Sequence, residues 1–340
     1  RVLFRSKIYM KSVTLAHGSG GVESNKLIGD VFFSRLKNDI LLSAEDAAVF
    51  RIEGKTAFTT DSFIVSPIFF AGGDIGKIAV CGSCNDLAVM GARPKYLSLS
   101  LIIEEGFSID DLETIADSIA RELEVNGAKV VTGDTKIAPK GSVDKIFINT
   151  SAVGEVVAEG LSCKNLKAGD KIIVSRSIGE HGATIFSGRE GINLTSSLKS
   201  DCASLWPTIE RLLQTKADIV AMRDATRGGV AAVLNEWCAS SSVSMECVEE
   251  SFAVKQEVLG VCELLGFEPF SLANEGTFVM AVRGDTSEVL SVLHSFEFTE
   301  DAAVVGEVMG DGKNRVVLKN GYGTKRIMEY PTGELLPRIC

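Results

Sequence analysis

The sequence predicts a two-domain protein of the α/β class, and three observations support this prediction. The chain has 340 residues, more than a single hydrophobic core usually accommodates. Strand patterns and helix patterns alternate along its first half. A polar, turn-rich stretch at 159–170 interrupts the alternation, which then starts again. We therefore expect domains at 10–158 and 168–320, followed by a mobile tail at 321–340.

Five elements are predicted in the first half. Runs of β-branched and aromatic residues predict strands, and apolar residues at helical spacing predict helices. The clearest helix has a capping-box pattern of Ser108 with Asp111 at its start, and Gly127 ends it. In chain order we expect a strand at 54–65, a helix at 76–92, a helix at 108–127, a strand and turn at 129–135, and a strand at 144–157.

The second half repeats the mixture of strands and helices. Apolar runs bounded by glycine predict its strands, and amphipathic stretches of about three turns predict its helices. In chain order we expect a strand at 170–179, helices at 204–214, 228–239 and 255–266, a strand at 276–284 and a helix at 286–296.

Composition and charge exclude several classes of protein. The net charge is −10 and no basic block could neutralise phosphates, so we expect no nucleic-acid partner. No apolar run approaches the roughly 18 residues of a membrane span, and no secretory signal is visible before Met10. Irregular spacing of the eight cysteines disfavours a disulfide framework and favours a reducing, cytoplasmic location. Cys81 and Cys84 form a lone C-x-x-C without further zinc ligands, so buried helix residues are the simpler interpretation.

Five aspartates stand next to small or polar residues: Asp46, Asp61, Asp86, Asp134 and Asp224. Each one alone is best explained as a helix cap or as a turn residue at the end of an apolar strand. Five in similar surroundings suggest a shared site, because clustered carboxylates need neutralisation and divalent cations with oxygen ligands provide it. Since Mg²⁺ binds through a few carboxylates together with phosphate oxygens, the pattern predicts a Mg²⁺–nucleotide site.

Two glycine-rich loops are candidates for holding phosphate groups. Neither the P-loop spacing nor G-x-G-x-x-G occurs. The stretch AHGSGG at 16–21 offers backbone N–H groups that an anion can approach closely, and a mobile turn is the alternative interpretation. The stretch ATRGG at 225–229 offers an arginine and glycine N–H groups at a predicted helix start. The candidate nucleotide ligands are therefore His17, Gly18, Ser19, Gly20, Gly21, Arg227, Gly228 and Gly229.

The motifs occur in an order that resembles a known family. They are AHGSGG, EDAAV, TTDSF, NDLAVMGA, TGDTK, RDATRGG, ANEG and, at the end, PRIC. From about residue 14 to 340 the chain resembles the hydrogenase maturation protein HypE. The aspartate motifs are shared with the wider superfamily of aminoimidazole ribonucleotide synthetase, selenophosphate synthetase and thiamine-monophosphate kinase. The last residue, Cys340 behind Pro-Arg-Ile, is what singles out the HypE family.

The resemblance implies a fold and a set of partners. It implies two α/β domains of the aminoimidazole ribonucleotide synthetase type, a homodimer whose N-terminal sheets form a barrel, and ATP with Mg²⁺ in the cleft. The five aspartates would hold the metal, and Asn149 would join the nucleotide-binding residues. The implied partners are the carbamoyltransferase HypF and the HypC–HypD complex.

The resemblance also implies a reaction on the last residue. HypF places a carbamoyl group on the Cys340 thiol, ATP-dependent dehydration converts it to a thiocyanate, and the cyano group passes to iron on HypC–HypD for [NiFe] hydrogenase. Glu275 and Lys136 are the candidates for removing protons from the nitrogen. For Lys136 a phosphate contact is an equally good interpretation, and for Glu275 the alternative is a buried structural carboxylate.

Two other functions are compatible with the motifs. A superfamily enzyme acting on a free small molecule would not need Cys340, and a non-enzymatic scaffold would bind nucleotide without turning it over. The carrier interpretation accounts for the tail, because the ten residues that follow Tyr330, up to and including Cys340, can extend over ~33–36 Å and prolines keep them extended. A prenylation signal does not fit, since its cysteine lies four positions from the end, where Pro337 stands.

Overall fold

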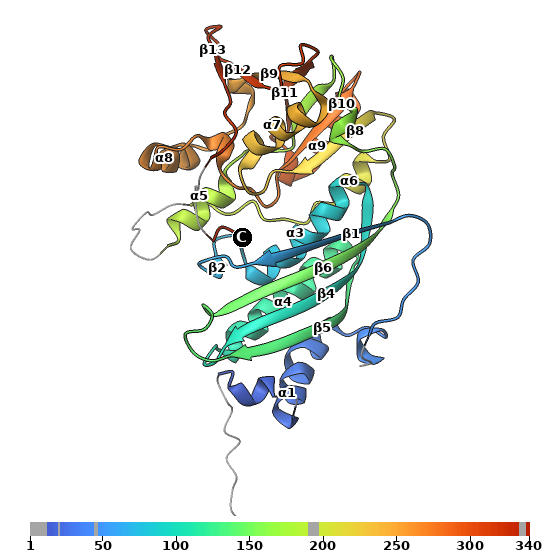
Figure 1. Ribbon diagram of the computed structural model, residues 1–340, viewed down its shortest axis with the longest axis vertical. Helices are drawn as coiled ribbons and strands as arrows, with labels where there is room; N and C mark the ends of the chain where they lie inside the picture. The colour runs from blue at the N-terminus through green and yellow to red at the C-terminus, as the bar shows by residue number, and fades with distance from the viewer. Residues whose placement is uncertain (1–11, 20, 44–46, 190–196, 333–337) are drawn as a thin grey trace, which may run out of the picture.

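The computed structural model describes residues 12–19, 21–43, 47–189, 197–332 and 338–340. Two of the predicted site residues, Gly20 and Asp46, lie outside the described residues. Figure 1 shows two α/β parts arranged along the long axis, with the N-terminal sheet below and the C-terminal sheet above. The predicted two-part α/β architecture is therefore confirmed.

The N-terminal part contains an open four-stranded sheet. Its strand order is β1-β6-β4-β5, in which β4 and β5 are parallel and the other pairs are antiparallel. The helices α3 and α4 pack against each other and against this sheet. Among the described residues the sheet does not close, so the predicted barrel is not formed within one chain. The bounds are β1 Thr56–Phe63, β2 Phe69–Phe70, β3 Gly73–Asp74, α3 Ile75–Val89, β4 Ala92–Glu104, α4 Ile109–Asn126, β5 Lys129–Ala138 and β6 Ile146–Val156, preceded by the short helices η1 Leu15–Gly18, α1 Val22–Leu27, η2 Ile28–Phe33, α2 Ser34–Leu36 and η3 Leu41–Ser43.

The two faces of this sheet differ, because alternate residues of a strand point to opposite sides. Asp61 and Thr150 are paired across β1 and β6 and face α3, where the Ser83 hydroxyl lies 2.7 Å from the Thr150 hydroxyl. The next pair along, Ser62 and Asn149, faces away from the helices. We call this second side the open face. It carries Phe58, Thr60, Ser62, Phe147, Asn149, Ser151, Ser98, Ser100, Ile102, Thr132, Asp134 and Lys136.

Local signals in the sequence explain α4 but not the full length of β5. The Ser108 side chain accepts a hydrogen bond from the Asp111 N–H at 3.3 Å, and Gly127 adopts the left-handed conformation that ends the helix. The turn predicted within 129–135 is wrong. The strand continues to Ala138 because β5 pairs with β4 over its whole length.

The C-terminal part contains a seven-stranded mixed sheet with helices on both sides. Its order is β13-β12-β9-β11-β7-β10-β8, with only β12 and β9 parallel among the described pairs. One face packs against α7 and the other against α6 and α9. All four predicted helices are confirmed, and α5 is an additional one. The bounds are η4 Cys163–Asn165, β7 Lys171–Val174, α5 Glu180–Ser187, α6 Trp206–Leu212, β8 Asp218–Asp224, α7 Gly229–Ser241, β9 Ser244–Val248, η5 Glu249–Ser251, α8 Gln256–Leu265, η6 Pro269–Ser271, β10 Phe278–Arg283, α9 Ser287–His294, η7 Glu297–Thr299, β11 Ala303–Met309, β12 Val316–Lys319 and β13 Lys325–Ile327.

The two parts share hydrophobic contacts. Ile185, Cys202 and Ala273 of the C-terminal part belong to the core of the N-terminal part, and Val89 at the end of α3 packs with α6. Residues 200–205 connect α3 and α4 with the loop that precedes β10, and we call them the interdomain segment. Because apolar side chains cross the boundary in both directions, the two parts are packed against each other.

The end of the chain returns to the boundary between the two parts. After β13 the Met328 side chain is buried, and the last three residues, 338–340, lie between α5 and the segment before α3 (Figure 1). Within the described tail, β13 pairs with β12 and residues 338–340 dock against the body of the protein, whereas the turn at Tyr322 is exposed. Release of the tail from this position stays a prediction.

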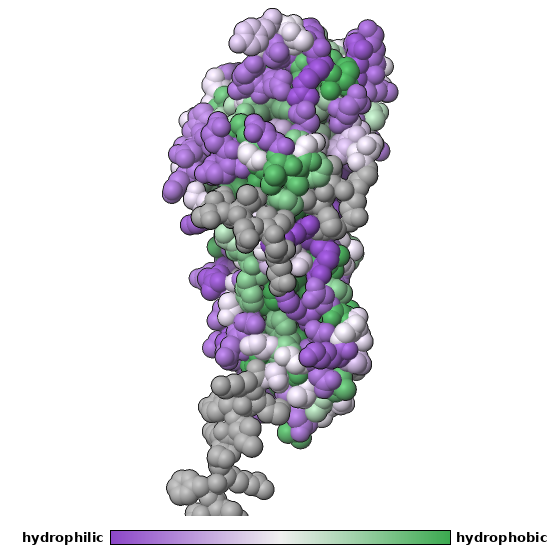
Figure 2. All heavy atoms as spheres, turned by 90° about the vertical axis from the view of Figure 1, so that its left-hand side faces the viewer, coloured by the Kyte–Doolittle hydropathy of each residue, from purple (hydrophilic) through white to green (hydrophobic). Residues whose placement is uncertain are grey.

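The surface has few features that call for explanation. Within the described ranges no helix is both long enough and apolar enough to cross a membrane. The side that carries α5 and α8 shows mostly polar groups with small apolar patches between them (Figure 2). Val49 and Tyr322 are strongly exposed in loops, where exposure of single apolar residues is normal for folded proteins.

Candidate active site

The last three residues pair with the strand-like segment that follows β1. The Ile64 N–H donates to the main-chain oxygen of Cys340 at 3.0 Å, and the Ser66 N–H donates to the Arg338 carbonyl at 3.1 Å. The Arg338 Nε returns a hydrogen bond to the Ile64 carbonyl at 2.8 Å. Backbone pairing of this kind fixes an added peptide segment without regard to its side chains.

Side chains add specificity to this docking. The Arg338 guanidinium forms an ion pair with Asp144 and lies 5.9 Å from the centre of the Phe147 ring. The Ile339 side chain is buried in the core of the N-terminal part. The sequence Arg-Ile-Cys is therefore held through a cation site, an apolar site and the backbone.

The Cys340 thiol is partly buried, and the charges of Glu275, Arg227 and Asp61 act on it. Burial raises the pKa of this thiol to about 12, the negative charge of Glu275 adds to the rise, and Arg227 opposes it. A thiol with this pKa stays protonated at neutral pH and is a poor nucleophile. The docked position therefore suits a loaded cysteine better than a cysteine that must first attack a carbamoyl donor.

Glu275 has no hydrogen-bond partner for its Oε1 atom among the described residues. The residue is 3% exposed, and burial together with the charges of Asp201 and Asp224 raises the pKa of its carboxyl well above the usual value. A buried polar atom without a partner is costly and is uncommon in folded proteins. This atom therefore has unused hydrogen-bonding capacity at the boundary between the two parts.

Asp201 holds the main chain around Glu275. One carboxylate oxygen accepts the Glu275 N–H at 3.0 Å, and the other accepts the Gly276 N–H at 3.0 Å and the Thr277 hydroxyl at 2.9 Å. A Cβ atom on Gly276 would lie 1.9 Å from the Asp201 carbonyl oxygen. The glycine in ANEG is thus required by this close approach.

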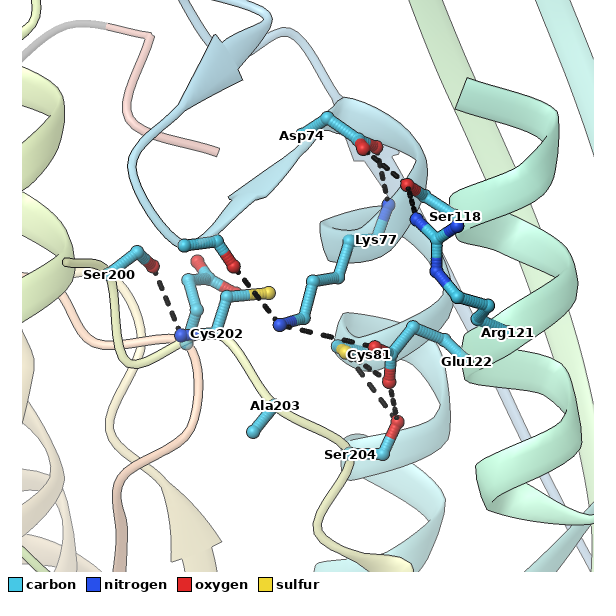
Figure 3. A network of polar contacts seen from close by, with 12 residues as sticks. Asp74, Lys77, Cys81, Ser118, Arg121, Glu122, Ser200, Cys202, Ala203 and Ser204 are labelled. Atoms are coloured by element: carbon cyan, nitrogen blue, oxygen red, sulfur yellow. Dashed lines mark hydrogen bonds and ion pairs between the residues drawn. The ribbon is translucent and has the colours of Figure 1, made fainter. Parts of the chain in front are cut away.

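The interdomain segment anchors this arrangement to α3 and α4. The Ser204 hydroxyl donates to the Glu122 carboxylate at 2.6 Å, and the Cys81 thiol lies 3.6 Å from both groups (Figure 3). The Asn85 amide donates to the Ala203 carbonyl at 3.0 Å. The buried cysteine of the C-x-x-C pair is thus part of a polar network between the two parts, and all eight cysteines are free thiols.

Three of the predicted metal ligands, Asp61, Asp86 and Asp224, act electrostatically on one another, and Asp61 also acts on Cys340. We call these three residues the aspartate cluster. The Asp86 carboxylate accepts a hydrogen bond from Thr59 at 2.6 Å, and Ser83 donates to Asp61 at 3.4 Å. Burial raises the pKa of Asp61 and Asp86, and burial and the charge of Asp86 raise that of Asp224 to about 7. Asp61 lies within β1 and Asp86 within α3, in agreement with the strand predicted at 54–65 and the helix predicted at 76–92, and Asp224 ends β8.

The donor chemistry of this cluster fits a hard divalent cation. Carboxylates that raise one another's pKa are short of positive charge, and Mg²⁺ supplies it through oxygen ligands. Within the described part of the chain no three acidic, histidine or cysteine side chains are already arranged around one point. Mg²⁺ needs no such cage, since it usually takes one or two carboxylates and completes its shell with phosphate and water.

Two residues of the AHGSGG loop lie elsewhere, together with Asp134 and Lys136. His17, Gly18, Asp134 and Lys136 line a cavity of about 340 Å³ between the N-terminal helices and the edge strand β5. The His17 ring is buried and accepts the Thr14 N–H at 3.0 Å, so it holds the loop. Lys136 pairs with Asp134 at 2.8 Å. We call this the edge cavity.

Within one chain the edge cavity and the aspartate cluster lie apart from each other. Asp61 and Asp134 lie on strands at opposite edges of the sheet, three strand spacings or about 14 Å apart. They also point to opposite faces, since Asp61 faces α3 and Asp134 lies on the open face. Lys136 and Glu275 are therefore not brought together within one chain.

The glycines of ATRGG have a packing role in this structure. Gly228 and Gly229 adopt positive φ angles at the start of α7, and a Cβ atom on Gly229 would lie 2.4 Å from the Leu272 carbonyl oxygen. Arg227 is exposed next to them and acts electrostatically on Asp61 and Cys340. Asn149 donates to the Asp61 carbonyl at 2.8 Å from the open face.

Two family models match the chain in succession. The N-terminal domain of AIR synthase related proteins matches residues 44–156, and the C-terminal domain matches residues 167–319. The carbamoyl dehydratase HypE of Escherichia coli (strain K12) is 44% identical over 339 residues, which cover 97% of this chain and 100% of that protein. This chain belongs to the HypE family.

Solved structures of HypE agree with the fold. A HypE structure in complex with ATP is 40% identical with a TM-score of 0.92, covering 96% of this chain and 99% of that chain. HypE in a HypE–HypF complex is 44% identical with a TM-score of 0.77, covering 90% and 99%. A thiamine monophosphate kinase from Aquifex aeolicus, 18% identical with a TM-score of 0.60, shares the fold alone.

Sequence reasoning missed Asp201 and Ser200, and it did not predict the contact that His181 makes with the tail. His181 lies 2.7 Å from the Ile339 carbonyl oxygen through Nε2 and 2.7 Å from the Ser200 hydroxyl through Nδ1. None of these residues belongs to a motif from which its role could be predicted. The only signal for Asp201 is that it follows Ser200 between two apolar segments, a setting similar to that of the other acidic motifs.

Proposed function

We propose that this HypE-family chain uses ATP to dehydrate a carbamoyl group carried on its own Cys340, giving a thiocyanate. The observation that carries the proposal is the docking of Cys340 at the boundary between the two parts, where the charges of Glu275 and Asp61 act on its thiol and Glu275 Oε1 has no partner. Carbamoyl dehydratases of this family share the full length of the chain. The cyano group would then pass to iron on a HypC–HypD partner for [NiFe] hydrogenase.

The reaction requires an activated oxygen and a base. The carbon–oxygen bond breaks with the oxygen leaving in phosphate derived from ATP, and two protons leave the nitrogen as the nitrile forms. Glu275 is the proposed acceptor for one of these protons. Burial raises the pKa of its carboxyl well above the ordinary value, and positive charge from a bound cation would lower that pKa again.

The aspartates supply the place for the metal. Asp61, Asp86 and Asp224 would hold Mg²⁺, which offsets the negative charge of the phosphates when bound. Arg227 would add a positive charge next to the same groups. Asp46, which lies outside the described residues, is proposed as a further ligand.

The edge cavity would serve the same reaction in a homodimer. The edge strands β1 and β5 and the open face are free to pair with a second copy, and a closed barrel removes exposed edges. The second copy would bring His17, Asp134 and Lys136 towards the aspartate cluster and so complete the nucleotide site. Replacing Phe58, which is 68% exposed on the open face, with glutamate should shift the protein from dimer to monomer in analytical ultracentrifugation; an unchanged mass would contradict this arrangement.

Loading of the cysteine would take place outside the cleft. The docked thiol is a poor nucleophile because its pKa is about 12, so a carbamoyltransferase of the HypF type would act on a released tail. A HypE–HypF complex is known for the family. The tail would therefore alternate between the partner and the cleft.

Phosphate release tests this function. Carbamoylated protein mixed with Mg²⁺-ATP should give a burst of one phosphate per loaded Cys340, and Cys340→Ala protein taken through the same loading should give no burst. A burst that survives Cys340→Ala when a free carboxamide is supplied would indicate an enzyme for small molecules. ATP binding without any carbamoyl-dependent burst would indicate a scaffold.

A further inference from the structure

The docked tail is held at two main-chain oxygens on either side of the Cys340 backbone. One is the oxygen of Cys340, which accepts the Ile64 N–H. The other is the Ile339 carbonyl, which lies 2.7 Å from His181 Nε2. Fixing both oxygens fixes the peptide plane that leads into Cys340, and it leaves the side-chain rotamer as the main freedom of the thiol.

The hydrogen bonds around His181 determine which ring nitrogen carries the proton. The Ile339 carbonyl can only accept, so Nε2 must be the donor. The ring is fully buried and burial lowers its pKa, which favours a neutral ring whose Nδ1 accepts. Nδ1 then accepts a hydrogen bond from the Ser200 hydroxyl, and the Ser200 oxygen accepts one from the Cys202 N–H at 3.0 Å. Every donor in this chain of contacts has one acceptor.

The surroundings of the ring leave it little freedom to turn. The Phe70 ring packs edgewise against His181 at 5.5 Å between centroids. Ser200 is itself fixed, because its N–H donates to the Ala71 carbonyl at 2.8 Å. The neighbouring Asp201 holds the main chain of Glu275. The same interdomain segment thus orients the group that binds the tail and the group proposed to act on it.

We propose that His181, with its proton placed on Nε2 by Ser200, is the positioning residue that holds the Cys340 tail in the cleft. Because His181 donates to a backbone carbonyl and not to the thiol, it holds the tail whether the thiol is free or loaded. The link to dehydration rests on the proposed function, whereas the holding of the tail does not. Loss of the Nε2 donor leaves a buried carbonyl without a partner, which should shift the equilibrium towards the released tail roughly 5- to 150-fold.

Two substitutions separate the donor from the ring. His181→Phe keeps a ring against Phe70 and removes the donor, whereas His181→Gln removes the ring and keeps an amide N–H that can reach the carbonyl. His294→Phe is the matched control, because the exposed His294 also faces a backbone carbonyl, that of Ala302 at 2.8 Å, far from the cleft. Each full-length protein is labelled with N-ethylmaleimide, and the mass of the C-terminal peptide reports the labelling rate of Cys340.

We expect His181→Phe to label roughly 5- to 150-fold faster than the parent, with His181→Gln close to the parent and His294→Phe unchanged. Equal labelling of His181→Phe and the parent would overturn the proposal, and so would labelling of His181→Gln as fast as that of His181→Phe. If His181→Phe does not fold, Ser200→Ala takes its place, and labelling of Cys340 at the parental rate in that variant would overturn the proposal.

A single-turnover measurement on the carbamoylated proteins links this to catalysis. Excess Mg²⁺-ATP should dehydrate the group more slowly in His181→Phe, with recovery in His181→Gln and with unchanged nucleotide affinity. Absence of dehydration in every protein including the parent would refute the proposed function, while the labelling rates would still decide the role of His181. Dehydration at the parental rate in His181→Phe, in a parent that does turn over, would overturn its role as a positioning residue.

Discussion

Substitution of Asp201 by asparagine tests the support of Glu275 most sharply. The carboxylate accepts three hydrogen bonds, from the Glu275 N–H, the Gly276 N–H and the Thr277 hydroxyl, and it is 2% exposed. Asparagine keeps one acceptor oxygen and places an NH₂ group against a second N–H. The change therefore removes at least one hydrogen bond to a charged acceptor and leaves a buried N–H unpaired. We expect the free energy of unfolding to fall by about 2–5 kcal/mol.

Denaturant unfolding followed by circular dichroism measures this loss, and the exposed Asp39→Asn serves as the control of equal chemistry. The dehydration rate should fall as well, because Glu275 loses its fixed main chain. A change in the free energy of unfolding below about 0.5 kcal/mol, the usual range for surface substitutions, together with a parental dehydration rate, would refute the reasoning.

Three further predictions concern the cleft. Glu275→Gln should lower the dehydration rate about 100-fold or more while ATP binding and the midpoint of thermal unfolding stay unchanged, because glutamine has the size of the carboxyl and carries no charge to bury; a normal rate of water loss by mass spectrometry would reject Glu275 as the base. Asp86→Asn should raise the Mg²⁺ concentration for half-maximal phosphate release about tenfold or more, without loss of stability since it relieves repulsion with Asp61 and Asp224; an unchanged Mg²⁺ titration would remove Asp86 from the metal site. Docking of the tail should weaken at high pH. The pKa of the thiol is about 12 when docked and 9.0 as its ordinary value. Between these two pH values the released tail has lost the thiol proton that the docked tail keeps, so the equilibrium constant for docking should fall about tenfold per pH unit. Below pH 9 it should not change. Carboxypeptidase release of Cys340, corrected for the enzyme's own pH profile, measures this, and a flat profile to pH 11 would contradict it.

Elements with complete local signals could be predicted from the sequence. The helix α4 has its cap at Ser108, its apolar stripe and its stop at Gly127 within 20 consecutive residues, and the structure follows them. The strand β5 runs through Gly133 and Asp134, which look like a turn, because pairing with β4 outweighs the local preference. Local patterns are therefore sufficient for an isolated amphipathic helix and insufficient for a strand held by its neighbour.

The site depends on contacts that local patterns do not contain. Asp201 meets Glu275 across 74 residues, and His181 meets Ile339 across 158 residues. The sequence predicted Cys340 and Glu275 as site residues through the resemblance of their motifs to a family. In the structure the charge of Glu275 acts on the Cys340 thiol. It also predicted one metal site for five aspartates, whereas a single chain separates Asp134 from the cluster because the sheet has two faces.

The central claim is that the carbamoyl group on Cys340 loses water in this protein. Mass spectrometry of the intact carbamoylated protein and of its C-terminal peptide, before and after addition of Mg²⁺-ATP, tests it directly. We expect the loss of the mass of one water molecule, confined to the peptide that contains Cys340. A carbamoyl mass that stays unchanged while ATP is consumed would contradict the account and move the chemistry to a free substrate.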